Sequence, residues 1–349
     1  MENKFIVEQK PFLSLLAAMQ PICTKRTTLD ATTYIMFAVG HKELVLKSTD
    51  LEISLQSSYL VKNSTMDQPC SFLVSGRRIF DLVKELDGDI SFIFDNNQLT
   101  LQSGSVDLAL NIKDAQEFPP FPERIENLMQ LSASFLMEML DKVAFLIPQN
   151  NANQALNGLY LEISDTEFKM TTTDGHCLAQ VSTTKYTLPE NKKWLLPRRA
   201  IFEVKKILES APDGSIFLGI CGNQLVFSGE SFNFFTKLLA DPFPQYAPIL
   251  NKEGFIGATV DRGQLVKTLR RSSCLLSGQF IATNFGFEPE RLQVSMQNKE
   301  VGKLKKPWHC MNFLAQSLMC VFMRPICSVV CKHFLMIRLN FFLRIHHGQ

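Results

Sequence analysis

The order of apolar and polar residues along the chain follows two periods. Apolar side chains recur at helical spacing over residues 79–86 and 201–208, and they form one stripe on each predicted helix. Between the helical stretches, residues 90–94, 99–102 and 293–296 alternate between apolar and polar side chains. Such alternation predicts short strands, and the Asp, Asn and Gly residues at their ends predict turns. The pattern therefore predicts an α+β fold with few helices and antiparallel sheets.

These elements belong to a segment that occurs more than once. Residues 73–86 return as 195–208, and Thr-Asp-Leu-Glu at 49–52 returns as Thr-Asp-Gly-His at 173–176. Corresponding segments lie 122 to 126 residues apart in the same order, which predicts tandem globular domains rather than short solenoid repeats. The predicted domains are 1–125, 126–252 and the start of a third at 253–302, followed by a tail at 303–349.

Basic residues accompany the helices. A further helix is predicted to open each domain, at about 10–19, 132–145 and 261–271. The cations at the helix starts or off the apolar stripes are Arg77, Arg78, Lys84, Arg198, Arg199, Lys205, Lys206, Arg262, Lys267, Arg270 and Arg271. A single basic face is commonly only solvated. A row of cations kept in successive copies suits a polyanion with a repeating backbone, bound through phosphates without reading sequence.

The net charge of +2 hides an uneven distribution. Residues 303–349 carry seven Lys or Arg and no Asp or Glu, so the first 302 residues carry 29 basic and 34 acidic side chains, a net charge of −5. This balance excludes a globally basic nucleic-acid binder, although it allows one basic face. The nine cysteines lack CxxC spacing and no secretory leader is recognisable, which predicts reduced thiols in the cytoplasm.

The tail at 303–349 differs from the rest of the chain. Codons for residues 303–308, read from the third base of the first codon, can encode Ala-Glu-Glu-Thr-Leu, which restores the missing carboxylates. We therefore predict that the tail is the product of a shifted reading frame. The tail also concentrates possible zinc ligands, but their spacing fits no common pattern, and its cations divide the apolar stretch into pieces too short to span a membrane. These possible ligands are Cys310, Cys320, Cys327, Cys331 and His333.

Catalytic motifs are sparse. Asp174 and His176 are the residues from which an acid–base pair of a hydrolase would be built. The corresponding residues of the first copy, Asp50 and Glu52, include no histidine. The shared Thr-Asp is therefore better explained by a turn, in which the aspartate accepts hydrogen bonds from backbone amides two residues on. No metal or cofactor motif is recognisable.

Taken together and in order, several motifs resemble the bacterial DNA polymerase III beta subunit, the sliding clamp, over roughly residues 3–302. They are Leu-Asn-Gly at 156–158, Thr-Asp-Gly-His at 173–176 followed by Leu-Ala, Arg-Arg with Ile-Phe at 77–80, and Phe-Pro-Gln-Tyr at 243–246. The resemblance implies three similar domains per chain and a head-to-tail homodimer that closes into a ring around duplex DNA. Lys25 and Arg26 would join the other cations that face the DNA.

The resemblance also implies what such a ring does. It has no active site or cofactor of its own and confers processivity on DNA replication, as an accessory subunit of a DNA-directed DNA polymerase. Its partners would be the catalytic subunit of DNA polymerase III, the clamp loader, and other polymerases and repair proteins that insert a short peptide. The peptide pocket would be formed by Leu156, Thr173, Gly175, His176, Leu178, Pro244 and Ile249. Dimer contacts would come from Leu108, Leu110, Cys274 and Leu275.

The chain departs from the family pattern at several positions. Cys177 and Pro248 stand where basic residues are usual, and Gln154-Ala155 replaces an aromatic pair. The family's third domain also continues well past Gly302. Alternatives are therefore a defective clamp that cannot close a ring and, from other classes, a hydrolase or a monomeric DNA-binding scaffold. A scaffold would bind linear DNA as tightly as circular DNA.

Overall fold

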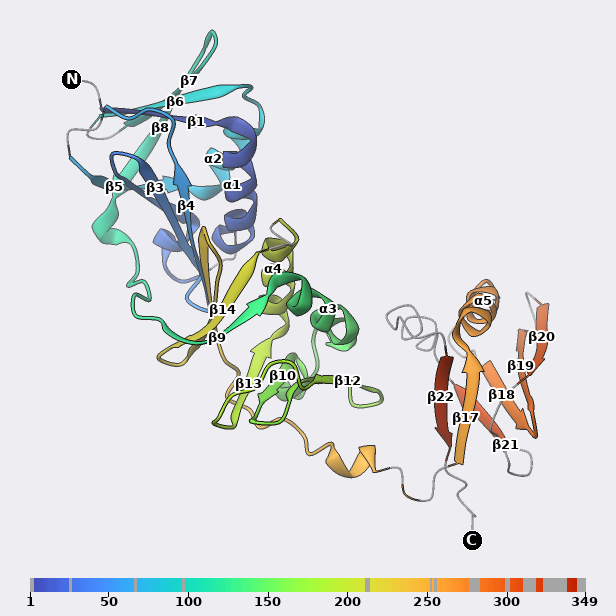
Figure 1. The fold of residues 1–349 in the computed structure, drawn as a ribbon. Coiled ribbons are helices and arrows are strands. Elements are labelled where there is room, and N and C mark those ends of the chain that lie inside the picture. Colours follow the sequence, from blue (N-terminus) through green and yellow to red (C-terminus); the bar gives the residue numbers. More distant parts are fainter. Residues whose placement is uncertain are drawn as a thin grey trace. The chain divides into compact units, whose positions relative to one another are not determined.

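The computed structural model describes most of the chain as two compact units, Met1–Phe243 and Pro244–Gln349 (Figure 1). The residues described are 3–24, 27–65, 68–95, 98–210, 214–251, 253, 256–275, 283–298, 302–309, 318–322 and 338–343. The family-derived expectation for Lys25 and Arg26 lies outside these residues. Each unit is described below on its own.

The first unit contains two successive sets of elements, which we call the first copy (3–114) and the second copy (126–237). The first copy comprises β1 (Asn3–Glu8), α1 (Gln9–Cys23), β2 (Tyr34–Val39), β3 (Glu43–Thr49), β4 (Ile53–Leu60), β5 (Cys70–Ser75), α2 (Gly76–Lys84), β6 (Asp89–Asp95), β7 (Gln98–Ser103) and β8 (Val106–Asp114). The second comprises β9 (Glu126–Ser132), α3 (Ala133–Val143), β10 (Gly158–Ile163), β11 (Phe168–Thr173), β12 (Leu178–Thr183), β13 (Lys192–Pro197), α4 (Arg198–Glu209), β14 (Ser215–Cys221), β15 (Gln224–Ser228) and β16 (Phe232–Lys237).

The strand order shows that the two copies share one topology. In the first copy the hydrogen-bonded orders are β1-β6-β7-β8 and β5-β2-β3-β4, and in the second they are β9-β14-β15-β16 and β13-β10-β11-β12. Every element thus has a counterpart at the same place in the other copy. All of these neighbours pair antiparallel. The prediction of an α+β fold built from repeated antiparallel sheets is confirmed.

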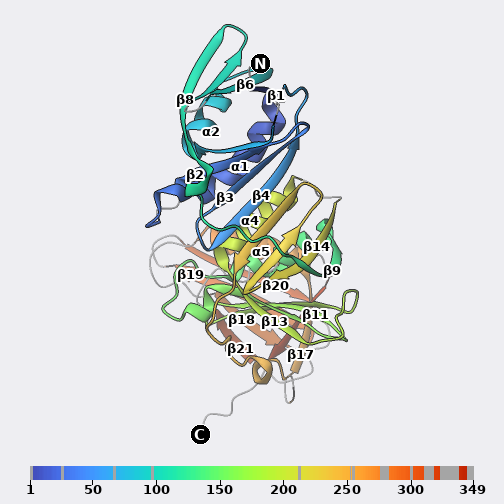
Figure 2. The ribbon, with the colours of Figure 1, turned by 90° about the vertical axis from the view of Figure 1, so that its left-hand side faces the viewer.

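The copies are joined by a strand pair. β4 of the first copy pairs antiparallel with β16 of the second, from Ile53↔Thr236 to Ser57↔Phe232, so that one twelve-stranded sheet runs through both copies. Backbone bonds extend the joint at both ends, from the Ser58 amide to the Ser231 carbonyl (2.8 Å) and from the Lys237 amide to the Glu52 carbonyl (2.9 Å). Figure 2 shows the blue strands of the first copy continuing into the yellow strands of the second.

The helices cover the sheets with the apolar stripes that the sequence predicted. On α2, Ile79 and Val83 are fully buried and Phe80 is half-buried. On α4, Ile201 and Val204 are buried in the same way. The predicted helices at 10–19 and 132–145 are present as α1 and α3, although each carries a single lysine, so the basic character lies mainly on α2 and α4.

The second unit repeats part of the same topology. Its elements are β17 (Ile256–Asp261), α5 (Arg262–Ser273), β18 (Thr283–Glu288), β19 (Arg291–Asn298), β20 (Gly302–His309), β21 (Leu318–Phe322) and β22 (Arg338–Leu343). The order β20-β19-β18-β21 corresponds to β4-β3-β2-β5, and the pair β17-β22 corresponds to β1-β6. Asp261 caps α5 by accepting a bond from the Gln264 amide (2.7 Å), which explains where the predicted helix begins.

Three of these strands lie wholly or largely in the tail. β20 pairs with β19, β21 with β18, and β22 with β17, all antiparallel. The described strands of the tail are thus paired, which does not favour the alternative of a defective clamp. Of the possible zinc ligands, Cys320 belongs to β21, and the other four lie outside the described residues. No helix among the described residues is long and apolar enough to cross a membrane.

Candidate functional site

The cations of α2 lie on the exposed side of the helix. Arg77, Arg78 and Lys84 are all exposed, opposite the buried stripe. The Arg77 side chain is 79% exposed and its nearest acidic group is Asp81, at 3.8 Å. Charges this exposed interact weakly with each other in water. These three side chains therefore lie open to solvent.

The cations of α4 have other partners. Arg198 donates from Nη1 to the Ile147 carbonyl (2.8 Å) and its guanidinium lies over the Phe202 ring, 4.4 Å from the centroid. Arg199 pairs with Asp50 and donates from Nη2 to the Pro21 carbonyl (3.0 Å). Both arginines are half-buried. Both arginines thus make contacts within the protein. The sequence did not predict these contacts.

The two lysines of α4 are paired as well. Lys205 forms an ion pair with Asp141 of α3, and only 19% of its side chain is exposed. Lys206 pairs with Glu203 one turn earlier on the same helix, at 3.1 Å, and its own side chain is 61% exposed. Lys206 therefore presents charge to solvent, while Lys205 mainly connects α4 to α3.

The helix α5 resembles α2 more than α4. Arg270 and Arg271 in its last turn are both exposed, and Lys267 is exposed one turn earlier. Basic side chains in the last turn also favour the helix because they face the negative end of its dipole. Of the cations that the sequence assigned to these helices, the exposed ones therefore lie on α2, on α5 and at Lys206.

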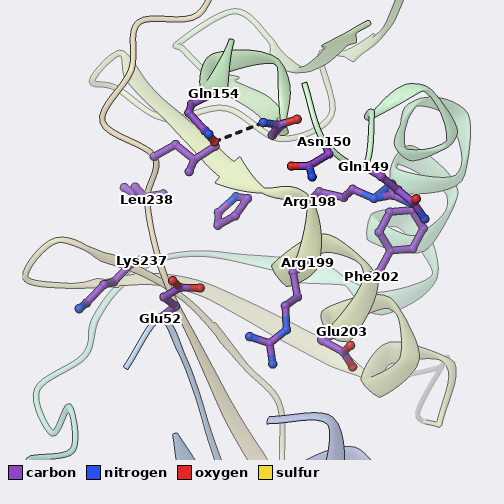
Figure 3. A pocket seen from close by; sticks show the side chains of 13 residues that line it. Glu52, Gln149, Asn150, Gln154, Arg198, Arg199, Phe202, Glu203, Lys237 and Leu238 are labelled. Carbon is purple, nitrogen blue, oxygen red and sulfur yellow. Dashed lines mark hydrogen bonds between the residues drawn. The ribbon is translucent and has the colours of Figure 1, made fainter. Parts of the chain in front are cut away.

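A cavity of about 920 Å³ lies where α4 meets the joint between the two copies (Figure 3). The side chains that line it come from both copies and are mainly polar. Asn157 also lines the cavity, and its amide donates to the Asn151 carbonyl (2.9 Å) and to Gln154 Oε1 (3.2 Å). The lining residues include Glu52, Gln149, Asn150, Gln154, Arg198, Arg199, Glu203 and Lys237.

The repeated Thr-Asp turns have the hydrogen bonds that the sequence predicted. Asp50 Oδ1 accepts from the amides of Glu52 (2.9 Å) and Ile53 (2.8 Å). Asp174 Oδ1 accepts from the amides of His176 (2.8 Å) and Cys177 (2.7 Å). The carboxylate that the hydrolase hypothesis needs is thus occupied in shaping a turn.

Electrostatics distinguish the two aspartates. Burial alone raises the pKa of Asp50, but hydrogen bonds from Arg199 and from two backbone amides outweigh burial and lower that pKa below its usual range. Burial also raises the pKa of Asp174, and there the amides of Cys177 and His176 reverse the effect, so that this pKa too is lowered. Of the two aspartates, Asp50 is the one whose pKa is lowered partly by an arginine. Both groups remain carboxylates near neutral pH.

The first-unit residues of the expected peptide pocket lie around the second Thr-Asp turn. Gly175 and His176 are exposed, and Leu178 is half-buried. Leu156 is buried in the short helical turn Gln154–Leu156, and a Cβ built on Gly175 would lie 3.6 Å from its Cδ1 atom. Thr173 Oγ1 donates to the Cys177 carbonyl (2.6 Å) and accepts from the Gly175 amide (3.1 Å). The structure therefore brings Leu156 and the turn together.

The remaining pocket residues belong to the second unit. Pro244 is exposed and lies at the start of that unit, and Ile249 in the short helical turn Ala247–Leu250 is 69% exposed. The part of the chain that the structure describes holds no group of three or more His, Cys, Asp or Glu able to bind a metal.

The expected dimer residues lie near open edges. Leu108 and Leu110 are half-buried on β8, which pairs with β7 along its length and with β5 only at Phe72–Val74. Among the described residues, β8 therefore has no second strand beside 106–111. Cys274 and Leu275 follow α5 and are exposed and half-buried respectively.

Comparison with protein families matches both copies. The family described as the DNA polymerase III beta subunit, N-terminal domain, matches residues 3–122, and its central domain matches residues 130–245. Curated relatives include the beta sliding clamp of Pseudomonas putida, 25% identical over 300 residues (85% of this chain and 81% of the relative). That of Chlamydia muridarum is 24% identical over 313 residues (86% and 82%).

Solved structures share the fold. The DNA polymerase III subunit beta from Pseudomonas aeruginosa superposes with a TM-score of 0.88 at 22% identity, covering 98% of this chain and 93% of that one. The DNA polymerase sliding clamp from Bacillus subtilis gives 0.90 at 20% identity, covering 99% and 93%. The structural likeness thus covers more of this chain than the likeness in sequence does.

Proposed function

The chain belongs to the family of DNA polymerase III beta subunits, and from this premise we propose that it is a DNA sliding clamp that encircles duplex DNA. The clamp tethers the replicative polymerase to its template and so gives DNA replication its processivity. The observation that carries the proposal is the β4–β16 joint, because it shows how one copy attaches to the next.

The joint between the copies uses two types of strand edge, and the same two types could pair again between two chains. It connects the β4-type edge of one copy to the β8-type edge of the following copy, since β16 is the counterpart of β8. Edges of both types are open among the described residues: β8 at 106–111, and β20, the counterpart of β4, which pairs only with β19. Open strand edges are sites of pairing between chains. A joint of the same kind between two chains would make a head-to-tail dimer and close a ring.

The exposed cations support the binding of DNA. Arg77, Arg78 and Lys84 on α2 and the exposed arginines of α5 suit phosphate contacts, which are independent of sequence and weakened by salt. A closed ring needs only such weak contacts, because dissociation requires the ring to open. The clamp itself needs no active site or cofactor, and it acts in the cytoplasm, where a bacterial chromosome is copied.

Partners would bind through short peptides. The turn at Thr173–His176 with Leu156 and Leu178 offers an apolar surface with polar edges, the usual character of a peptide site. Ile249 and Pro244, which the family pattern also assigns to the pocket, are exposed in the second unit. The partners are the catalytic subunit of DNA polymerase III, the clamp loader, and other polymerases and repair proteins. A clamp from Pseudomonas aeruginosa has been solved bound to griselimycin, which shows that a relative binds a ligand.

Retention on DNA tests the proposal. The protein would be loaded onto a nicked circular plasmid with a bacterial clamp loader and then separated from free protein by gel filtration. A clamp stays on the circle and is lost when a restriction enzyme linearises the plasmid. Equal retention on circular and linear DNA would instead support the monomeric scaffold. A hydrolase would instead show an activity that His176→Ala abolishes.

We propose in addition that residues 303–349 result from a shifted reading frame, in which case the restored frame would supply the edge strand that β20 forms here. The support is the absence of carboxylates in the tail together with the acidic sequence that the alternative frame can encode. Sequencing the gene from fresh genomic DNA across the codons for residues 297–306 tests this directly. A missing or additional base would establish the shift, and an unaltered frame would refute it.

A further inference from the structure

The Arg199 side chain donates its hydrogen bonds to acceptors in the other copy. It starts from α4 in the second copy, and both of its acceptors, the Asp50 carboxylate and the Pro21 carbonyl, belong to the first. Figure 3 shows its side chain directed away from Arg198 and toward the first-copy elements. The contact therefore spans the boundary between the copies on the side of the helices.

The acceptors explain why an arginine is needed. The Asp50 side chain is fully buried, and a buried carboxylate is costly unless it is paired and hydrogen-bonded. Its Oδ1 atom is occupied by two turn amides, and its Oδ2 atom takes Arg199. Pro21 lies in the last turn of α1, whose final carbonyls have no partner within the helix. One planar guanidinium thus pairs with the carboxylate and caps the helix.

The same position in the first copy provides a natural comparison. The repeat places Arg77 in register with Arg199 and Asp174 in register with Asp50. Arg77 is 79% exposed, whereas 31% of the Arg199 side chain is exposed. Although the two arginines occupy the same position in the repeat, they have different surroundings.

We propose that Arg199 is a positioning residue that clasps the second copy onto the first, and that it is not primarily a phosphate contact. The β4–β16 pair joins the copies through the sheet, and α4 also touches α1 in the helix layer. If the β4–β16 strand pair were the only contact, the two copies could turn relative to each other about the direction of that strand pair. The contact between Arg199 and Asp50 lies in the helix layer, away from the strand pair, and opposes this rotation. It thereby holds α2 and α4 at the angle at which their exposed cations face the same DNA, a consequence that rests on the proposed function.

A double-mutant cycle in the full-length protein tests the clasp without DNA. The variants are Arg199→Ala, Asp50→Asn and the double variant, with Arg77→Ala, Asp174→Asn and their double variant as the matched control. Arg199→Ala removes the cation that pairs with a buried carboxylate, so adding Asp50→Asn should lower the equilibrium constant for urea unfolding about tenfold relative to Arg199→Ala alone. The control pair should be additive. An additive Arg199/Asp50 pair would overturn the proposal.

Hydrogen exchange locates the effect. In Arg199→Ala, the amides of Ser58 and Lys237, which bond across the joint, should lose protection, while the amides between β14 and β15 should keep theirs. Arg199→Lys should restore only part of the protection, because an ammonium offers one point of charge instead of a planar fork. Unchanged protection at the joint in Arg199→Ala would contradict a clasp.

The salt dependence of duplex binding separates a clasp from a phosphate contact. Arg77→Ala should reduce the slope of log K against log salt by about 0.9, the value for one phosphate contact. Arg199→Ala should leave this slope unchanged. A reduction in Arg199→Ala equal to that of Arg77→Ala would assign Arg199 to the DNA. If neither variant alters the slope while the cycle shows coupling, the clasp stands and the proposed DNA contact of Arg77 fails.

Discussion

Arg77 and Arg199 occupy the same position in two copies of one fold, yet their surroundings differ. Arg77 is exposed at the start of α2, and Arg199 reaches across the joint to a buried carboxylate at the start of α4. The helix starts differ too. At the position of Arg198 on α4, α2 has Gly76, where a Cβ would lie 2.8 Å from the Cβ of Cys23 in α1, so α2 leaves no room for a side chain there. The comparison teaches that a repeated cation can stay open to solvent in one copy and pair with a buried acid of the other copy.

The two Thr-Asp turns show the same division. Both aspartates accept two backbone amides, and both turns place the following residue at positive φ, Leu51 at 73° and Gly175 at 90°. The first turn is covered by the second copy through Arg199. The local structure is thus common to both turns, while the use made of the carboxylate is not.

The largest effect on stability is expected at the position that follows these arginines, where α2 has Arg78 and α4 has Ala200. Ala200 is 1% exposed on α4, and its counterpart Arg78 is exposed on α2. Ala200→Arg would bury a cation in a packed site and is expected to lower the free energy of unfolding by about 3 kcal/mol. Arg78→Ala should change it by less than about 0.5 kcal/mol. Urea unfolding measures both, and similar losses would show that α2 and α4 are equally covered.

The two aspartates should differ next. Asp50→Ala removes two turn bonds and the partner of Arg199, for an expected loss of about 3 kcal/mol. Asp174→Ala removes only the bonds to the turn amides and should cost about 1.5 kcal/mol. Equal losses in thermal or urea unfolding would mean that the contact with Arg199 adds nothing to the stability of the fold.

The residues at positive φ should respond in opposite directions. Gly175→Ala places a Cβ in a left-handed conformation and should cost about 1 kcal/mol, since the only nearby atom, Leu156 Cδ1, is at an ordinary contact distance. Leu51→Gly relieves the same strain and should raise the free energy of unfolding by up to about 1 kcal/mol. Unfolding curves of the two variants check the signs, and two losses would show that side-chain packing of Leu51 outweighs its backbone strain.

The smallest effect concerns pH. The pKa of Asp50 is lower in the folded protein than in the unfolded chain, so the unfolded chain binds the proton more readily as pH falls below about 4. The contribution of Asp50 to stability is present above that pH and is lost as pH falls through its folded pKa. Asp50→Asn should remove this part of the slope in urea titrations between about pH 5 and 2. An unaltered slope would show that the carboxylate of Asp50 is not the group responsible.

Many local features of this protein follow from short stretches of sequence. The apolar stripe at Ile79 and Val83, the alternation at 90–94 and the Thr-Asp turns each depend on neighbours within a few residues, so their structure could be predicted. The repeat placed the same elements in both copies, and the strand orders confirm it. The partners of Arg198, Arg199 and Lys205 could not be predicted, because they lie 51, 149 and 64 residues away in the chain.

The sequence by itself determined the family, the repeated α+β topology and the presence of a basic row on the second helix of each copy. Only the tertiary structure decided which of those cations face solvent. The physical reason is that the periodicity of a helix specifies which face is apolar, whereas the contacts of its polar face depend on what the next copy brings to it. Arg77 has no buried acid beside it and stays exposed, and Arg199 meets Asp50 because the β4–β16 joint sets the two copies side by side.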